Sequence, residues 1–194
     1  MSKAIYSASR KVPFIGCDID GVLKLGKIAL PKAKESVKLI RDKDIPFLLI
    51  TNAGGDLECN RSKYISKILN IQDDEKYRIK PHEIILCHSP MRNLYNMYKD
   101  KLLLINGVDR YEEVIVNYGF TNYMTVNEYA HIFHKDLLPY KKYYTNDLNK
   151  LESDYRNKVE KRLNRSLKTY PRINCIFNLT DTRNLFEAVQ VILY

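Results

Sequence analysis

Two aspartates stand one residue apart near the start of this chain of 194 residues. An apolar run over 14–17 leads into Asp18 and Asp20, and Gly21 follows. Like charges this close repel each other and resist burial, so folding alone gives little reason for the pair. A carboxylate nucleophile at Asp18 and an acid/base carboxyl at Asp20 would serve phosphoryl transfer. Mg²⁺ is the expected metal, because it takes few carboxylates and keeps water and substrate phosphate as ligands.

A second apolar run, 47–50, also ends in polar residues. Thr51 and Asn52 follow it directly, and Gly54 and Gly55 come next. The Thr51 hydroxyl can donate a hydrogen bond to a phosphate oxygen, and the backbone from Asn52 onward offers N–H groups to an anion. The chain has only 7 glycines, and five of them lie in or beside these two loops. The two loops together therefore predict one phosphate site.

Other chemistries fit the same residues less well. A calcium loop also begins Asp-x-Asp, but Val22 and Ala29 stand where ligands are required, and its glycine is missing. His131 and His134 lack a third ligand at a recognisable zinc spacing. For His88 a structural role is favoured over contact with substrate.

Apolar runs alternate with helical patterns along the chain. Strands are expected at 12–18, 46–51, 83–87, 102–105, 123–126 and 173–179, and helices at 31–44, 57–70, 90–99, 111–118, 145–168 and 184–193. Continuously apolar strands alternating with helices indicate a parallel sheet covered on both faces. Ligands of such sheets bind beyond the carboxyl ends of the strands, which is where both candidate loops fall.

Charge and composition limit the choice of partners. The formal net charge is +9, and residues 135–172 hold eleven Lys/Arg against five Asp/Glu. This basic stretch is interpreted as a solvated helix, and we do not expect nucleic acid as a partner. No apolar stretch approaches the length of a membrane span, so no membrane partner is expected. The four cysteines show no Cys-x-x-Cys spacing, which is typical of a reducing compartment. A cytoplasmic location is expected, with a mitochondrial one as the alternative, because the first twelve residues carry bases and no acids.

The two loops resemble a known family. Asp18-Ile19-Asp20-Gly21-Val22 with Leu49-Ile50-Thr51-Asn52 looks like motifs I and II of the haloacid dehalogenase superfamily. Residues 28–52 resemble its class IIA members, the relatives of NagD and of nitrophenyl-phosphate and nucleotide phosphatases. Residues 51–55 and 84–91 are similar to the branch named after the cat eye syndrome critical region.

The resemblance implies a Rossmann-like core with an inserted α/β cap. It implies that Asp18 is nucleophile and magnesium ligand, and that Asp20 is acid/base group and binds the metal through its carbonyl. It implies that Thr51 and Asn52 hold the phosphate. Family members carry a lysine and further acidic residues after the cap, and no matching segment follows here. Core and cap are thus both expected to be incomplete, and this chain alone to be a weak or inactive phosphatase.

The resulting prediction is an α/β protein with two parts. Residues 1–92 would form the N-terminal part of the catalytic core, and residues 93–194 the first part of the cap, with a basic helical insertion at about 140–170. The predicted function is Mg²⁺-dependent hydrolysis of a small phosphorylated substrate through an aspartyl-phosphate. The alternative is a non-catalytic binding protein of the same fold. The expected protein partner is a second copy of the chain or a complementing C-terminal polypeptide.

Overall fold

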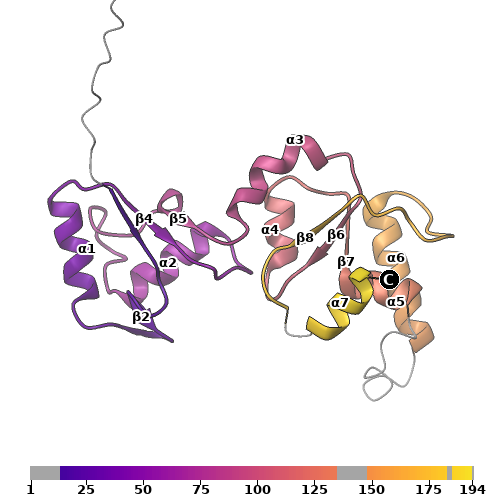
Figure 1. Ribbon diagram of the computed structural model, residues 1–194, viewed down its shortest axis with the longest axis horizontal. Coiled ribbons are helices and arrows are strands. Elements are labelled where there is room, and N and C mark those ends of the chain that lie inside the picture. The colour runs from indigo at the N-terminus through magenta and orange to yellow at the C-terminus, as the bar shows by residue number, and fades with distance from the viewer. Residues whose placement is uncertain (1–13, 135–147, 183–184, 194) are drawn as a thin grey trace, which may run out of the picture. The chain divides into compact units, whose positions relative to one another are not determined.

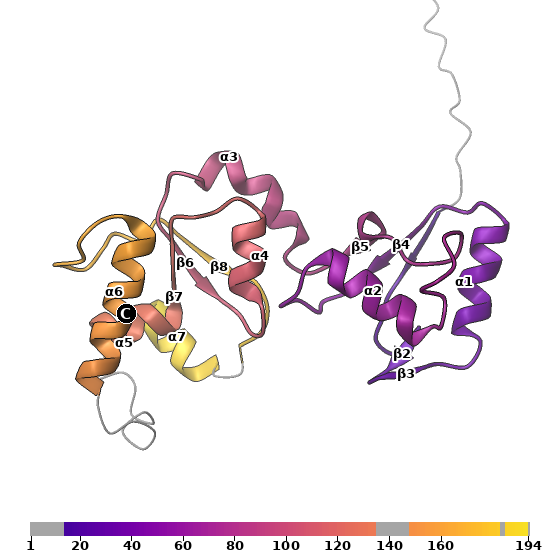
Figure 2. The ribbon, with the colours of Figure 1, turned by 180° about the vertical axis from the view of Figure 1, so that it is seen from behind.

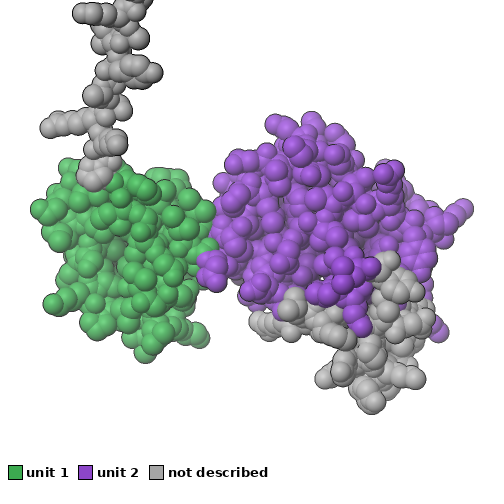
Figure 3. All heavy atoms as spheres, viewed as in Figure 1, with its two compact units in different colours: residues 1–51, 58–85 green, residues 52–57, 86–194 purple. Residues whose placement is uncertain are grey.

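The computed structural model describes residues 14–134, 148–182 and 185–193. The chain divides into two compact units (Figure 3). Unit 1 consists of Met1–Thr51 and Glu58–Ile85, and unit 2 of Asn52–Leu57 and Leu86–Tyr194. Residues 12 and 13 of the first expected strand, and the part of the basic stretch within 135–147, lie outside the described residues.

Unit 1 is built on a parallel sheet of three strands. Its order is β1-β4-β5, and the strands are β1 (Ile15–Cys17), β4 (Phe47–Ile50) and β5 (Ile84–Ile85). The unit also contains α1 (Ala33–Asp42), α2 (Glu58–Ile68) and the 3₁₀ turn η1 (Pro81–Glu83) (Figure 1). Its buried apolar side chains come from α1, α2, β4, β5 and the connecting loops: Ile19, Leu23, Ala33, Val37, Phe47, Leu49, Ile65, Leu69, Ile71, Ile79 and Ile84.

A small hairpin follows the first strand of unit 1. Strands β2 (Lys24–Leu25) and β3 (Ile28–Ala29) pair antiparallel, with Leu25 opposite Ile28 (Figure 2). Gly26 in the two-residue turn has φ +58°, a conformation that favours glycine. The sequence analysis did not predict this hairpin, because the segment is too short to show a strand period.

Unit 2 contains a second parallel sheet, with the order β7-β6-β8. Its strands are β6 (Leu103–Asn106), β7 (Tyr123–Thr125) and β8 (Cys175–Asn178). Its helices are α3 (Tyr95–Tyr98), α4 (Tyr111–Asn117), α5 (Val126–Phe133), α6 (Leu148–Leu163) and α7 (Leu185–Leu193), and the 3₁₀ segment η2 (Ser89–Leu94) precedes α3.

Both faces of the second sheet are covered. Along β6, Leu104 packs in a cluster with residues of α5, α6 and α7, while Leu103 and Ile105 pack with residues of α4. Successive side chains of a strand point to opposite faces, so an unbroken apolar strand must be covered on both sides. Figure 1 shows the two groups of helices on either side of this sheet.

The α/β class with parallel sheets, predicted from the alternating pattern, is confirmed. The expected helix over 90–99 is largely wrong: residues 89–94 form the 3₁₀ segment, and only α3 is α-helical. Helix α5 was missed, and α6 lies within the range of the expected basic insertion. The division into a core over 1–92 and a cap over 93–194 stays a prediction. Within the described residues, no helix is long and apolar enough to cross a membrane.

Candidate active site

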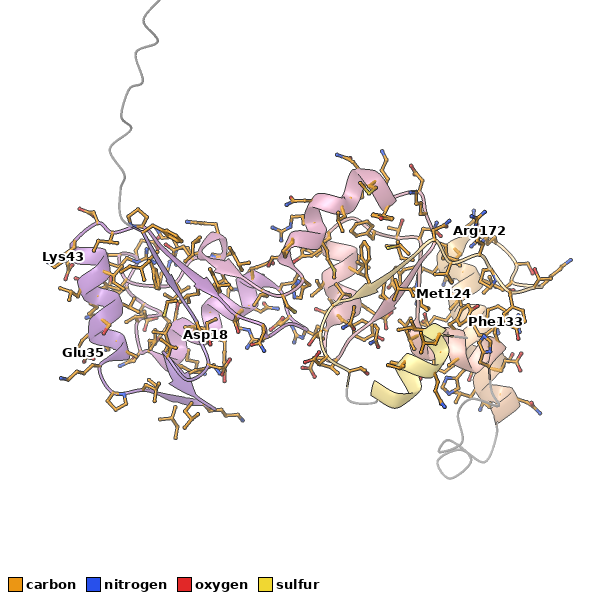
Figure 4. All side chains as sticks on the ribbon, in the orientation of Figure 1. Asp18, Glu35, Lys43, Met124, Phe133 and Arg172 are labelled. Carbon is orange, nitrogen blue, oxygen red and sulfur yellow. The ribbon has the colours of Figure 1, made fainter. Side chains whose placement is uncertain are left out.

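The pairing of β1 with β4 brings Asp18 and Thr51, the first residues of the two candidate loops, to the same end of the unit 1 sheet. Cys17 lies opposite Leu49 in a parallel register, so Asp18 and Thr51 both follow the carboxyl ends of neighbouring strands. Figure 4 shows Asp18 at the end of β1. The position expected from the fold rule, beyond the carboxyl ends of the strands, is therefore observed for Asp18 and Thr51.

Asp18 is exposed, and its carboxylate is partly fixed by its own loop. The Ile19 amide donates a hydrogen bond to Asp18 Oδ1 at 2.7 Å. Such a bond orients one oxygen and leaves the side chain accessible to a ligand from solvent. The adjacent thiol is no rival nucleophile, because burial and then the charge of Asp18 raise the pKa of Cys17.

Asp20 carries a partner that the sequence analysis missed. The ammonium of Lys24 forms an ion pair with Asp20 Oδ1 and also donates to the Gly26 carbonyl at 3.2 Å. Lys24 is buried, whereas the Asp20 side chain is 49% exposed. A spacing of four residues indicates a contact only on a helix, and these residues lie in a loop and a short strand.

Thr51 and Asn52 fall in different units. Thr51 is buried, and its amide donates to the Ile85 carbonyl of β5 at 3.0 Å, which continues the sheet beyond β4. Asn52 is exposed and opens the segment Asn52–Leu57 of unit 2. The structure therefore groups Asp18, Asp20 and Thr51 within unit 1, and the role of Asn52 in phosphate binding stays a prediction.

The glycines after Asn52 have a packing role. A Cβ at Gly54 would lie 2.7 Å from both Cys87 Sγ and the Leu179 carbonyl oxygen. Gly55 has φ +75°, and a Cβ there would lie 2.8 Å from the Val108 carbonyl oxygen. Close packing inside unit 2 is thus enough to require glycine at both positions.

His88 is a buried structural residue of unit 2. Its Nδ1 lies 2.8 Å from the Tyr118 hydroxyl and its Nε2 lies 3.1 Å from the Asp56 carbonyl oxygen. Because a carbonyl only accepts, Nε2 carries the proton and donates to it. The side chain has 0% exposure, which agrees with the favoured structural role.

The two aspartates suit Mg²⁺ in type and number. In the described part of the chain, no group of three or more His, Cys, Asp or Glu side chains gathers as a metal site. Magnesium is usually held by one or two carboxylates together with substrate phosphate and water, so it does not need a larger cluster. Asp18 and the main chain of Asp20 fit this habit, and metal binding itself remains a proposal.

Part of the basic stretch is neutralised within unit 2. Glu128 of α5 is 1% exposed and accepts hydrogen bonds from Arg162 of α6 at 2.7 and 2.8 Å. Lys158 lies 2.9 Å from the same carboxylate. The Arg162 side chain, 15% exposed, belongs to a packed interface between α5 and α6, so the interpretation of a solvated helix is wrong at this position, whereas the Lys158 side chain is 52% exposed.

The chain can now be placed in a family. The family model described as haloacid dehalogenase-like hydrolase matches residues 15–121, more than half of the chain, and the match includes all four predicted site residues. The chain belongs to the haloacid dehalogenase-like hydrolase family.

Two curated proteins resemble this chain. A mitochondrial hydrolase of Saccharomyces cerevisiae is 31% identical over 134 residues, which cover 69% of this chain and 35% of that protein. A fusion protein of Schizosaccharomyces pombe, named as a CMP-forming cardiolipin synthase and mitochondrial hydrolase, is 33% identical over 110 residues, covering 57% of this chain and 17% of that protein. The chain thus spans about a third of the first relative and about a sixth of the second.

Two solved structures are similar at low identity. A hypothetical protein of Pyrococcus horikoshii has a TM-score of 0.46 and 19% identity, over 58% of this chain and 40% of that one. NagD of Escherichia coli has a TM-score of 0.48 and 15% identity, over 93% of this chain and 74% of that one. The sequence-based recognition of a haloacid dehalogenase-type hydrolase is confirmed by the family match.

Proposed function

We propose that unit 1 carries the site of a Mg²⁺-dependent hydrolase of small phosphate monoesters that works through an aspartyl-phosphate. The observation that carries the proposal is the register of β1 against β4, which puts Asp18 and Thr51 at one sheet edge with Asp20 two residues on. The family match supports the hydrolase class. The restriction to phosphate esters rests on the chemistry of these three side chains.

The proposed reaction has two displacements at phosphorus. The Asp18 carboxylate attacks, a P–O bond to Asp18 forms, and the bond to the leaving oxygen breaks while Asp20 gives that oxygen a proton. Water then attacks the phosphorus, Asp20 takes a proton from it, and the bond to Asp18 breaks to release inorganic phosphate. Throughout, the Thr51 hydroxyl donates a hydrogen bond to a non-transferring phosphate oxygen.

The metal would be held by the Asp18 carboxylate and the Asp20 carbonyl. When bound, Mg²⁺ supplies positive charge that offsets the repulsion between an anionic nucleophile and an anionic substrate. The Ile19 amide contributes to the same end, because its hydrogen bond of 2.7 Å fixes the orientation of the Asp18 carboxylate before substrate arrives.

A complementing strand is proposed as the protein partner. In the described residues no strand pairs with the outer edge of β1, and Phe14, which precedes β1, is 58% exposed. An uncovered edge of this kind is a template for pairing. A second copy of this chain or a complementing C-terminal polypeptide would cover it.

A mitochondrial location is also proposed. Both curated relatives carry the words mitochondrial hydrolase in their names. Microscopy of the full chain fused at its C-terminus to a fluorescent protein tests this, with a mitochondrial dye as the reference. A diffuse cytoplasmic signal would contradict the proposal.

The alternative is a binding protein of the same fold without catalysis. Beryllium fluoride, which mimics a phosphoryl group on a carboxylate, separates the two. It should raise the melting temperature of the hydrolase-type site only with Mg²⁺, and Asp18→Asn should abolish the shift. A shift that needs no metal and survives Asp18→Asn would support the binding protein.

A further inference from the structure

Lys24 is a buried lysine beside the proposed acid/base group. It is 6% exposed, and lysine is almost never buried unless its charge is paired. Its ammonium meets the Asp20 carboxylate and the Gly26 carbonyl oxygen, which lies 3.2 Å away. Removing an ammonium from water is unfavourable, so this arrangement persists only because the loop holds both partners in place.

The loop that joins Asp20 to Lys24 is tightly hydrogen-bonded. The Ile19 carbonyl accepts from the amides of Leu23 and Lys24 at 2.9 and 3.1 Å, and the Gly21 amide donates to the Lys24 carbonyl at 2.7 Å. Gly21 has φ +84°, which lets the chain turn back on itself. The side chains of Ile19 and Leu23 are buried beneath this turn.

The pair leaves Asp20 oriented but open. One carboxylate oxygen is fixed by the lysine while the side chain keeps 49% exposure, so a ligand can still approach it. The Lys24 ammonium also lies 6.0 Å from the centre of the Tyr64 ring of α2. Lys24 therefore faces the site and is not an exposed lysine of the hairpin.

We propose that Lys24 is a positioning residue of this site, which holds the Asp20 carboxylate in one orientation and places one positive charge beside the bound phosphoryl group. The inference rests on the proposed function and deepens it. Asp18 and Asp20 bring two negative charges to a loop that must accept an anionic ligand, and Lys24 cancels one of them.

The experiment measures beryllium fluoride binding to the full chain with Mg²⁺ by fluorine NMR. Lys24→Met removes the charge at similar length, Lys24→Arg keeps it, and Lys27→Met removes a charge from an exposed lysine of the same hairpin. Lys24→Met should weaken binding about tenfold, as loss of one charge-assisted hydrogen bond predicts. Lys24→Arg should recover most of the affinity, and Lys27→Met should match the unmodified chain.

Amide hydrogen exchange of the ligand-free chain measures directly how firmly Lys24 holds the loop of Asp20. Amides of residues 20–24 should exchange faster in Lys24→Met than in Lys27→Met, with the rest of unit 1 unchanged. If Lys24→Met does not fold, as circular dichroism would show, Lys24→Gln replaces it in both measurements.

The possible failures are distinct. If the unmodified chain does not bind beryllium fluoride with Mg²⁺, the proposed function fails and the role of Lys24 fails with it. If the chain binds and Asp18→Asn does not, the proposed function stands. In that case, two results would overturn the role of Lys24 alone. One is that Lys24→Met binds beryllium fluoride as tightly as the unmodified chain, and the other is that Lys24→Arg loses as much affinity as Lys24→Met.

Discussion

The two sheets of this protein differ in how completely they are covered. In unit 2 the central strand β6 has a partner on each side, and Leu103, Leu104 and Ile105 are at most 3% exposed. In unit 1 the first strand β1 lies at an edge of its sheet, and Phe14 beside it is 58% exposed. Strand β1, which leads into the candidate catalytic aspartates, is therefore less buried than β6.

The carboxylates of the two units also differ in how deeply they are buried. Unit 2 buries its carboxylate Glu128 among several donors, which serves packing. Unit 1 keeps Asp18 exposed and Asp20 half exposed, with a single lysine on the latter. A buried, fully satisfied carboxylate stabilises an interface, whereas an exposed carboxylate with one fixed oxygen can still meet a ligand.

The largest expected effect is the loss of phosphatase activity when the nucleophile of unit 1 is removed. Asp18→Asn removes the nucleophile, so whatever Mg²⁺-dependent release of phosphate from an aryl phosphate this chain shows, which we expect to be slow, should fall to the assay background. The melting temperature should change little, because Asp18 is exposed. Robust turnover by this variant would show that the paired aspartates are not the catalytic site.

A large stability effect is expected at the buried carboxylate of unit 2. Glu128→Ala leaves Arg162 without its bidentate partner and removes half of the capping box with Thr125. The free energy of unfolding of unit 2 should fall by about 3–5 kcal/mol in urea titration. The control Glu113→Ala alters an exposed glutamate of α4 and should stay within about 0.5 kcal/mol.

Acid should weaken the same interface. Burial raises the pKa of Glu128. The hydrogen bonds and charges of Arg162, the Thr125 amide and Lys158 lower this pKa by more than burial raises it, so the net pKa lies below the usual value of 4.5. A carboxylate with a lowered folded pKa stabilises the fold above its unfolded pKa, and this stability is lost as pH falls through the folded pKa. Urea titrations from pH 7 to pH 3 should show a decline below about 4.5 that is smaller in Glu128→Gln.

A smaller effect is expected from two glycines with positive φ. Gly55→Ala strains the backbone and also puts a Cβ 2.8 Å from the Val108 carbonyl oxygen, so it should destabilise unit 2 by about 2–3 kcal/mol. Gly26→Ala has the same kind of strain at φ +58° but no atom within 4 Å, so about 1 kcal/mol is expected in unit 1. Equal effects in urea titration would contradict the packing role of Gly55.

The smallest effect concerns the open edge of β1. Phe14→Lys should weaken self-association in sedimentation equilibrium several-fold, because a charge beside an edge strand opposes pairing. Leu39→Lys changes a residue of α1 with a similar exposed fraction, 56%, and should leave association unchanged. A chain that stays monomeric at every concentration would remove the second copy as partner and leave the complementing polypeptide.

Local patterns predicted the elements that bear the site. The apolar runs before Asp18 and Thr51 became β1 and β4, because a short, continuously apolar run bounded by turn residues favours a strand. Helix α5 was missed although its signal was present: Thr125 and Glu128 are spaced as a capping box, and each side chain accepts a hydrogen bond from the backbone of the other.

Other features could not be predicted from pattern. The glycines at 54 and 55 were interpreted as an anion cradle, but their packing partners near 108 and 179 are distant in the chain. The partner of Glu128 is 34 residues away on α6. Such contacts depend on which helix faces meet, and that is decided by packing.

The sequence by itself determined that two carboxylates follow an apolar strand and that a threonine follows the next one, because strand formation and chain order are local properties. Only the tertiary structure decided that Lys24 turns back onto Asp20, since this requires the bend at Gly21 and the burial of Ile19 and Leu23 beneath it. Only packing, likewise, decided that β1 lies at the edge of the sheet that the described residues form.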